Sequence, residues 1–285
     1  MNKIKPYLLI APATILLTLI MGIGIITCIC QSLGCFPQIG LNNITFDYYK
    51  EILRDKQFIE SLCLSLKTAF ISSIISVGIG LLLAYCMSKS KFSKIRYFMI
   101  NLPIIVPHIV VVILIFAIFS KSGIISRILF NIGIINDSNE FISLVNDKYG
   151  IGIILVYIYK GTPFIAMTAY NVLKSIDDKL EFVAKNLGAN NYQTFKFVIL
   201  PQILPSLISS FIILFAFSFG SFEVPYLIGA TNPKALPVNA YINYIGLDLI
   251  NQRPKAMAMN TIIAIISFVL LIIYNNLLNK INRYK

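Results

Sequence analysis

EFVAKNLGANNYQTFKFVILPQILPS, residues 181–206, is a polar, glycine-containing stretch in a chain that is otherwise apolar enough to cross a membrane. Asp177 and Asp178 precede it and can begin a helix, because a short acidic side chain accepts hydrogen bonds from free N–H groups and suits the positive end of the helix dipole. Gly188 then stands where a helix commonly ends with one residue in the left-handed conformation. A first short helix is therefore predicted to end at this glycine.

A second helix is predicted directly after the turn. Asn190 and Gln193 have the spacing of a capping box, in which each side chain accepts a hydrogen bond from the other residue's backbone N–H. Pro201 and Pro205 are expected to bend or restart the chain further on. Each helix has one apolar face, formed by Leu180, Val183, Ala184 and Leu187 in the first and by Phe195, Val198 and Ile199 in the second. The stretch is thus predicted to be an amphipathic helix-turn-helix, which is either a connector lying on lipid or a docking element for a partner.

The composition predicts a membrane protein. The 285 residues are 57% hydrophobic and 13% charged, with a mean hydropathy of +0.80, whereas a soluble domain is about half apolar and a quarter charged. A membrane-spanning helix needs about 20 apolar residues. Six stretches qualify, namely Tyr7–Cys30, Ser61–Met87, Tyr97–Phe119, Tyr149–Leu173, Leu204–Ala230 and Asn260–Leu278. We therefore expect an all-α, six-helix bundle that forms one transmembrane domain over residues 1–285.

The distribution of Lys and Arg predicts the orientation. These residues are more frequent at both termini and in the segments after the second and fourth spans than in the other connecting segments. Because cytoplasmic loops are enriched in Lys and Arg, both termini and residues 174–203 are predicted to be cytoplasmic. The same rule accounts for the net charge of +12, so nucleic-acid binding is not expected.

Several classes of function lack the residues that they need. No G-x-x-x-x-G-K-[ST] phosphate loop occurs, so the chain is not expected to bind ATP in that way. His108 is the single histidine, which argues against a Ser-His-Asp triad and a His-rich metal site. The five cysteines include Cys28 and Cys30, but no second pair follows with nearby histidines, so a zinc site is not expected. We expect neither an enzyme nor a metalloprotein.

Four ionisable residues lie within or near the ends of the apolar stretches: Lys67, His108, Lys160 and Glu223. A charge inside a membrane is costly and indicates function by default. Glu223 follows Gly220 and precedes Pro225, which can break a helix and expose backbone to a cavity. Glu223 is predicted to line a passage for a cationic solute, to form an ion pair with Lys160 or Lys67, or to lie close to the outer surface. Lys160 has the same alternatives, and His108 is more simply explained as a core residue.

Residues 181–206 resemble the "EAA" loop of the permease subunits of binding-protein-dependent ABC importers. Val183-Ala184 matches the Ala pair of that motif, Leu187-Gly188-Ala189 its central turn, and Val198-Ile199-Leu200-Pro201 its ending. Phe182 occupies the position of the motif's Glu, and the carboxylate lies one residue earlier, at Glu181. Leu102-Pro103 through Pro107 also fits the family, so the similarity extends over most of the chain.

The resemblance implies a type I ABC importer permease with no catalytic residue or cofactor of its own, since ATP would bind a partner ATPase. That partner would contact Glu181, Ala184, Leu187, Gly188, Ala189, Leu200 and Pro201, and its closure would make a mid-membrane cleft face outward and inward in turn. Glu223, Lys160 and His108 would line the pathway. A second permease subunit (a copy or a paralogue), an extracytoplasmic solute-binding protein and membrane lipid are the other implied partners.

The substrate is left open by the sequence. The segment SFGSFEVPYLIG, which contains Glu223, and the stretch from Asn232 to Met259 look most like permeases for polyamines such as spermidine and putrescine. Permeases for iron(III), phosphonate, thiamine and sulfate share this architecture. Two other classes of function also fit an apolar chain with a cytoplasmic helix-turn-helix: a membrane scaffold or sensor, and an ion-coupled secondary transporter.

Overall fold

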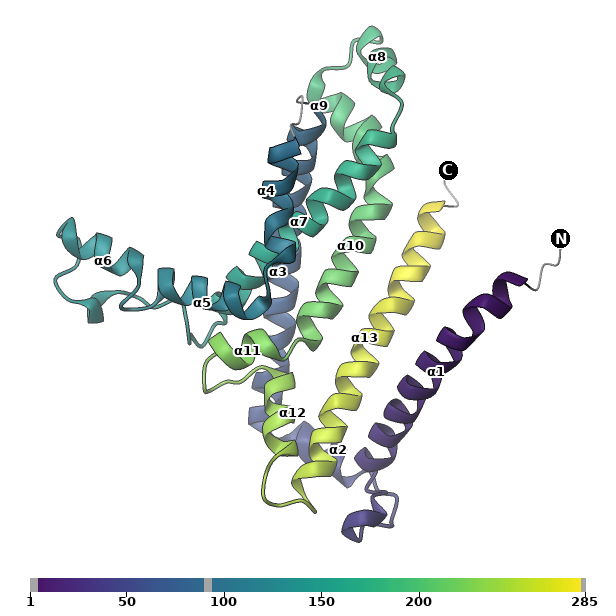
Figure 1. The fold of residues 1–285 in the computed structure, drawn as a ribbon, viewed down its shortest axis with the longest axis vertical. Helices are drawn as coiled ribbons and strands as arrows, with labels where there is room; N and C mark the ends of the chain where they lie inside the picture. The colour runs from purple at the N-terminus through teal and green to yellow at the C-terminus, as the bar shows by residue number, and fades with distance from the viewer. Residues whose placement is uncertain (1–4, 90–93, 283–285) are drawn as a thin grey trace. The chain divides into compact units, whose positions relative to one another are not determined.

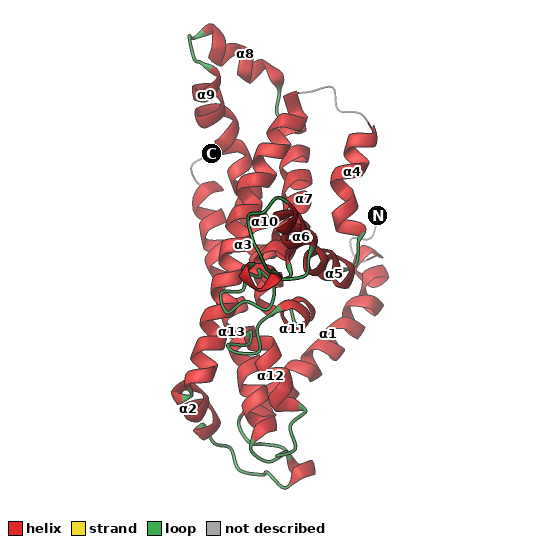
Figure 2. Cartoon of the chain, turned by 90° about the vertical axis from the view of Figure 1, so that its left-hand side faces the viewer, coloured by secondary structure: helices red, strands yellow, loops and turns green. Residues whose placement is uncertain are grey.

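The computed structural model describes residues 5–89 and 94–282, and the all-α prediction is confirmed over this part of the chain. Figure 2 shows helices joined by loops, without a strand in the part described. Six of the described helical stretches are long and apolar enough to cross a membrane: Leu9–Ser32, Lys56–Lys89, His108–Asn131, Ile151–Ser175, Asn191–Gly220 and Gln252–Asn276. The chain is divided into two compact units.

The first unit comprises residues 1–59 and 236–265. It contains α1 (Lys5–Ser32), a 3₁₀ turn (Pro37–Ile39), α2 (Asp47–Arg54), α12 (Leu236–Tyr244) and the first half of α13 (Gln252–Asn282). The buried Ser32 hydroxyl bonds the Tyr49 hydroxyl at 2.7 Å, and Lys255 forms an ion pair with Glu51 at 2.7 Å. Hydrogen bonds from Thr45 and Lys50 hold the pKa of the Asp47 carboxyl below its usual value.

The second unit comprises residues 60–235 and 266–285 and contains the helix-turn-helix. Its elements are α3 (Lys56–Lys89), α4 (Lys94–Ile105), α5 (His108–Phe119), α6 (Ile124–Asn131), a 3₁₀ turn (Ser138–Glu140), α7 (Ile151–Ser175), α8 (Asp178–Asn186), α9 (Asn191–Thr194), a π-helical segment (Phe195–Ile199), α10 (Leu200–Gly220) and α11 (Glu223–Ile228). Within this unit α7 packs against α4, α5 and α10, and α8 with α9 forms a tip beyond the ends of α7 and α10 (Figure 1).

Two of the predicted spans differ from the helices in the structure. The stretch predicted as one span from Tyr97 to Phe119 is broken between α4 and α5, because Pro107 has no N–H and disfavours helical backbone at the residue before it. The stretch predicted from Leu204 to Ala230 is also divided. Its helix ends at Gly220, and α11 is a separate short helix.

Small residues allow α3 and α7 to approach each other closely. A Cβ at Gly80 of α3 would lie 2.7 Å from Cβ and from Cγ2 of Ile165 on α7, so a larger residue does not fit there. The same helix buries a row of hydroxyl residues: Ser61, Ser65, Thr68, Ser72, Ser73 and Ser76. Small and hydroxyl-bearing residues at an interface are typical of helices that pack inside a membrane, where apolar burial does not drive association.

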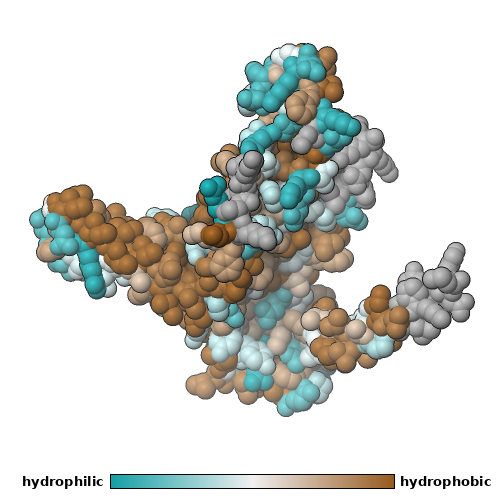
Figure 3. Space-filling view, turned by 45° about the horizontal axis from the view of Figure 1, so that its top comes forward, coloured by the Kyte–Doolittle hydropathy of each residue, from teal (hydrophilic) through white to brown (hydrophobic). Residues whose placement is uncertain are grey.

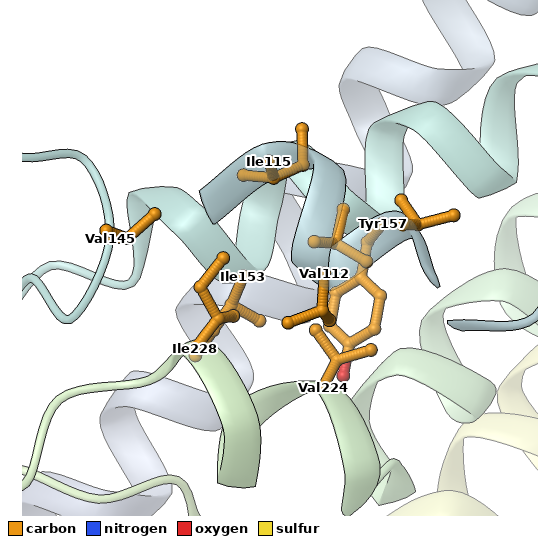
Figure 4. Close-up of a cluster of buried hydrophobic side chains, with 9 residues drawn as sticks. Val112, Ile115, Val145, Ile153, Tyr157, Val224 and Ile228 are labelled. Carbon is orange, nitrogen blue, oxygen red and sulfur yellow. The ribbon is translucent and has the colours of Figure 1, made fainter. Parts of the chain in front are cut away.

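A cluster of buried apolar side chains fixes α5 and α11 on α7. Val112 and Ile115 of α5 meet Ile153 and Tyr157 of α7, and α11 completes the contact (Figure 4). The residues from α11 are Val224 and Ile228, both fully buried. The cluster therefore holds α5 and α11 against the first half of α7, which also carries Lys160.

Candidate functional site

The helix-turn-helix predicted from the sequence is present, and its capping interactions are confirmed. The Asp177 side chain accepts a hydrogen bond from the Lys179 N–H at 3.0 Å and so caps α8. Gly188 has φ = +86°, the left-handed conformation that ends the helix. Asn190 and Gln193 form the reciprocal capping box, with both hydrogen bonds at 2.8 Å. Local hydrogen bonding therefore fixes the turn.

Most of the apolar face of α8 is exposed, and Ala184 is its one buried member. Leu187 is 84% exposed, whereas Ala184 on the same helix is 9% exposed. Leu180 and Val183 are exposed as well, and so is Phe182, which stands where the family motif has Glu. Figure 3 shows mainly hydrophilic residues over the tip, with apolar patches among them. An exposed apolar surface rimmed by polar residues is typical of a docking site.

The second helix continues into a stretch that is long and apolar enough to cross a membrane, instead of ending as a short element. From Asn191 the chain is helical to Gly220, and the π-helical segment joins α9 to α10. Ile199 is buried and Leu200 is half-buried, while Pro201 is exposed in the first turn of α10. The motif's ending thus forms the start of a helix that is long and apolar enough to span a membrane.

Glu181, which lies one residue before the Glu position of the family motif, contacts another helix of the same chain. Its carboxylate forms an ion pair at 2.5 Å with Lys89, in the last turn of α3. The exposed fraction of the side chain is 21% for Glu181 and 43% for Lys89. No local pattern predicts this contact, since 92 residues separate the partners. The carboxylate of Glu181 is therefore directed at α3 and not outward from α8.

The predicted pathway residues lie around the apolar cluster of α5, α7 and α11. Lys160 follows Tyr157 by three residues on α7, Glu223 precedes Val224 on α11, and His108 begins α5. The His108 ring lies 5.5 Å from the Phe217 ring of α10. The three residues predicted to line a passage thus lie on the three helices that this apolar cluster joins.

Lys160 binds the broken helix. Its ammonium donates hydrogen bonds to the carbonyl oxygens of Ile104 at 3.1 Å and Val106 at 2.6 Å. These carbonyls lack helical partners because α4 ends here and Pro107 follows. A cation also suits the negative end of the helix dipole. The prolines were the signal that free carbonyls occur here, but the sequence did not show which residue would satisfy them.

The alternative in which Glu223 forms an ion pair with a lysine is not what the structure shows. Lys160 donates to backbone carbonyls, and Lys67 lies 5.1 Å from the centre of the Tyr149 ring. Glu223 is exposed, and over residues 5–89 and 94–282 the structure records no ion pair for it. The described residues also contain no group of three or more His, Cys, Asp or Glu side chains that could hold a metal ion.

Comparison with known proteins identifies the class to which these features belong. Residues 76–283 match the family described as "Binding-protein-dependent transport system inner membrane component". The chain is 31% identical over 214 residues to the molybdate/tungstate transport system permease protein of Pyrococcus furiosus, which covers 74% of this chain and 76% of the relative. The protein belongs to this family of inner-membrane permease components, which are multi-pass membrane subunits of ABC importers.

Other relatives in the family carry different substrate names. The sulfate transport system permease protein of Salmonella typhimurium is 24% identical over 85% of this chain and 84% of its own length. The spermidine/putrescine transport system permease protein of Haemophilus influenzae is 28% identical over 76% of this chain and 74% of its own length. Among solved structures, a bacterial ABC transporter for the acidic polysaccharide alginate superposes with a TM-score of 0.79, 20% identity and 97% coverage of both chains, which shows a shared fold.

Proposed function

We propose that the protein is the permease subunit of an importer that is driven by a separate ATPase, and that this ATPase docks on the tip formed by α8 and α9. The observation that carries the proposal is the exposed apolar face of α8, with Leu187 84% exposed at the end of a rigidly capped turn. The membership of the family supports it. In this proposal Ala184, Gly188 and Ala189 shape the turn, while Leu200 and Pro201 transmit its movement into α10.

The remaining parts of the assembly follow from the same proposal. Both termini and the α8–α9 tip lie in the cytoplasm, where Lys and Arg are enriched. A second permease subunit, a copy or a paralogue, completes the pathway, and a solute-binding protein delivers the solute from outside. The chain itself needs no cofactor and no nucleic acid, because ATP is bound and hydrolysed on the partner.

We propose further that the solute is a cation of the polyamine type. The positive charge of Lys160 already interacts with two carbonyl oxygens, whereas the Glu223 carboxylate is exposed and has no recorded ion pair within the described residues. The Lys160 ammonium keeps its charge but its hydrogen bonds are occupied, so the Glu223 carboxylate is the one of these two groups that is free to contact a solute. The molybdate/tungstate and sulfate relatives favour an oxyanion as the second candidate.

Uptake into proteoliposomes that contain the assembled importer and its binding protein separates these candidates. We expect ATP-dependent uptake of labelled putrescine or spermidine, and a reduction of about tenfold in Glu223→Gln, because losing one charge-assisted hydrogen bond to the solute costs about 1.4 kcal/mol. Glu140→Gln, which changes an exposed acid of another loop, is the matched control. Uptake of molybdate or sulfate instead would overturn the cation assignment, and uptake without the ATPase would overturn the permease assignment.

A further inference from the structure

The attachment of α8 to the spanning helices depends on few side chains. Three of its four apolar residues are exposed, as is Leu187 at its C-terminal cap, and Ala184 is the one that is buried. Two cavities, of about 370 and 270 Å³, lie on either side of Glu181, and Lys89 lines both of them. The space beneath α8 is therefore hollow instead of packed, so the Lys89–Glu181 ion pair crosses a gap that apolar contacts do not fill.

The last turn of α3 holds both halves of the helix-turn-helix. Lys89 pairs with Glu181 of α8, and its ammonium lies 5.7 Å from the centre of the Tyr85 ring. The Tyr85 ring in turn meets the Phe195 ring edge-on, with 5.0 Å between the ring centres. Phe195 begins the π-helical segment after α9. Tyr85 and Lys89, one turn apart on α3, thus contact the two sides of the turn at Gly188.

We propose that Lys89 is a positioning residue that couples the inner end of α3 to α8, and that the Lys89–Glu181 pair makes α3 move together with the tip when the ATPase moves it. This inference rests on the proposed function. In this arrangement Glu181 acts within the permease itself, because its carboxylate lies on the side of α8 opposite to the exposed apolar face. The partner would then bind the apolar face, while Glu181 carries the displacement to α3.

The pair is tested with Lys89→Met, Glu181→Gln, the double variant and the charge-exchanged variant Lys89→Glu with Glu181→Lys. The assembled importer is reconstituted with its binding protein, and solute transported per ATP hydrolysed is measured together with recovery of the ATPase on the purified permease. We expect each single variant to lower that ratio by about fivefold, the factor for an interaction of roughly 1 kcal/mol, with unchanged ATPase recovery. The double variant is expected to fall no further, and charge exchange to restore at least half of the ratio.

Lys174→Met is the matched control. Lys174 lies in the last turn of α7 at the same end of the unit, and its ammonium lies 5.7 Å from a tyrosine ring, that of Tyr170, as Lys89 does from Tyr85. Among the described residues it forms no ion pair with α8, so its replacement is expected to leave the ratio unchanged. The inference would be overturned by an unchanged transport-to-hydrolysis ratio in Lys89→Met. It would also be overturned if the losses of the two single variants added up in the double variant, or if charge exchange did not restore the ratio. If wild-type permease recovers no ATPase, the proposed function itself is wrong.

Discussion

Replacing Gly188 isolates the contribution of the turn between α8 and α9. Gly188 has φ = +86°, and a Cβ built on it meets no atom within 4 Å. A substitution therefore introduces backbone strain without a steric clash. The left-handed conformation costs an L-residue roughly 1–2 kcal/mol, less for Asn and more for a β-branched residue. The variants Gly188→Asn, Gly188→Ala and Gly188→Val form a series of increasing strain at one position.

The expected result is a graded loss of ATPase binding. If the ATPase binds the capped turn alone, a strain of 1–2 kcal/mol lowers the apparent affinity by about 5-fold to 30-fold, since about 1.4 kcal/mol corresponds to a factor of ten. Gly188→Asn should stay closest to wild type, and Gly188→Val should be weakest. The measurement is a titration of the purified permease with the ATPase, with co-purification as a first screen.

Gly133 provides the control for strain in general. It has φ = +77° and also no atom within 4 Å of an added Cβ, but it lies after α6, away from the tip. Gly133→Val should therefore leave ATPase binding unchanged. Equal binding by Gly188→Asn and Gly188→Val would refute the reasoning, because it would mean that the left-handed turn is not needed for docking.

Two further predictions concern the spanning helices. Gly80→Ala should lower the melting temperature in detergent, since its Cβ would lie 2.7 Å from Ile165 and overpacking costs about 1–3 kcal/mol. Gly78→Ala is the control, because a Cβ there meets no atom within 4 Å, and it should raise the melting temperature or leave it unchanged. The opposite order of the two variants would contradict the packing described. Lys160→Met should destabilise the protein by about 1–3 kcal/mol, because the Val106 carbonyl loses its donor. An unchanged denaturant midpoint would show that water replaces the ammonium.

The local features of the helix-turn-helix could be predicted because they depend on neighbours in the sequence. The capping box joins residues three apart, and the cap of α8 joins Asp177 to Lys179, two residues on. The left-handed backbone of Gly188 depends on the residue itself. Six apolar stretches likewise follow from hydropathy, which needs no knowledge of packing.

The remaining features depend on contacts between distant residues. Hydropathy shows no interruption at Val106, so the break between α4 and α5 was not expected from the apolar run. Lys160 was considered as a partner of Glu223, but the carbonyls freed by that break, 54 and 56 residues away, take its hydrogen bonds. The ion pair of Glu181 with Lys89 was missed for the same reason, since no sequence period relates α8 to the end of α3.

The π-helical segment sets the direction in which α9 faces relative to the helix that follows it, α10. Leu200 donates its backbone hydrogen bond to Phe195, five residues back, so this turn contains one residue more than an α-helical turn. Each residue of an α-helix advances the side chains by about 100°. The extra residue therefore turns α9 by about that angle relative to a straight continuation of α10. Its deletion would swing the capping box round the axis of the spanning helix without changing a single residue of the turn.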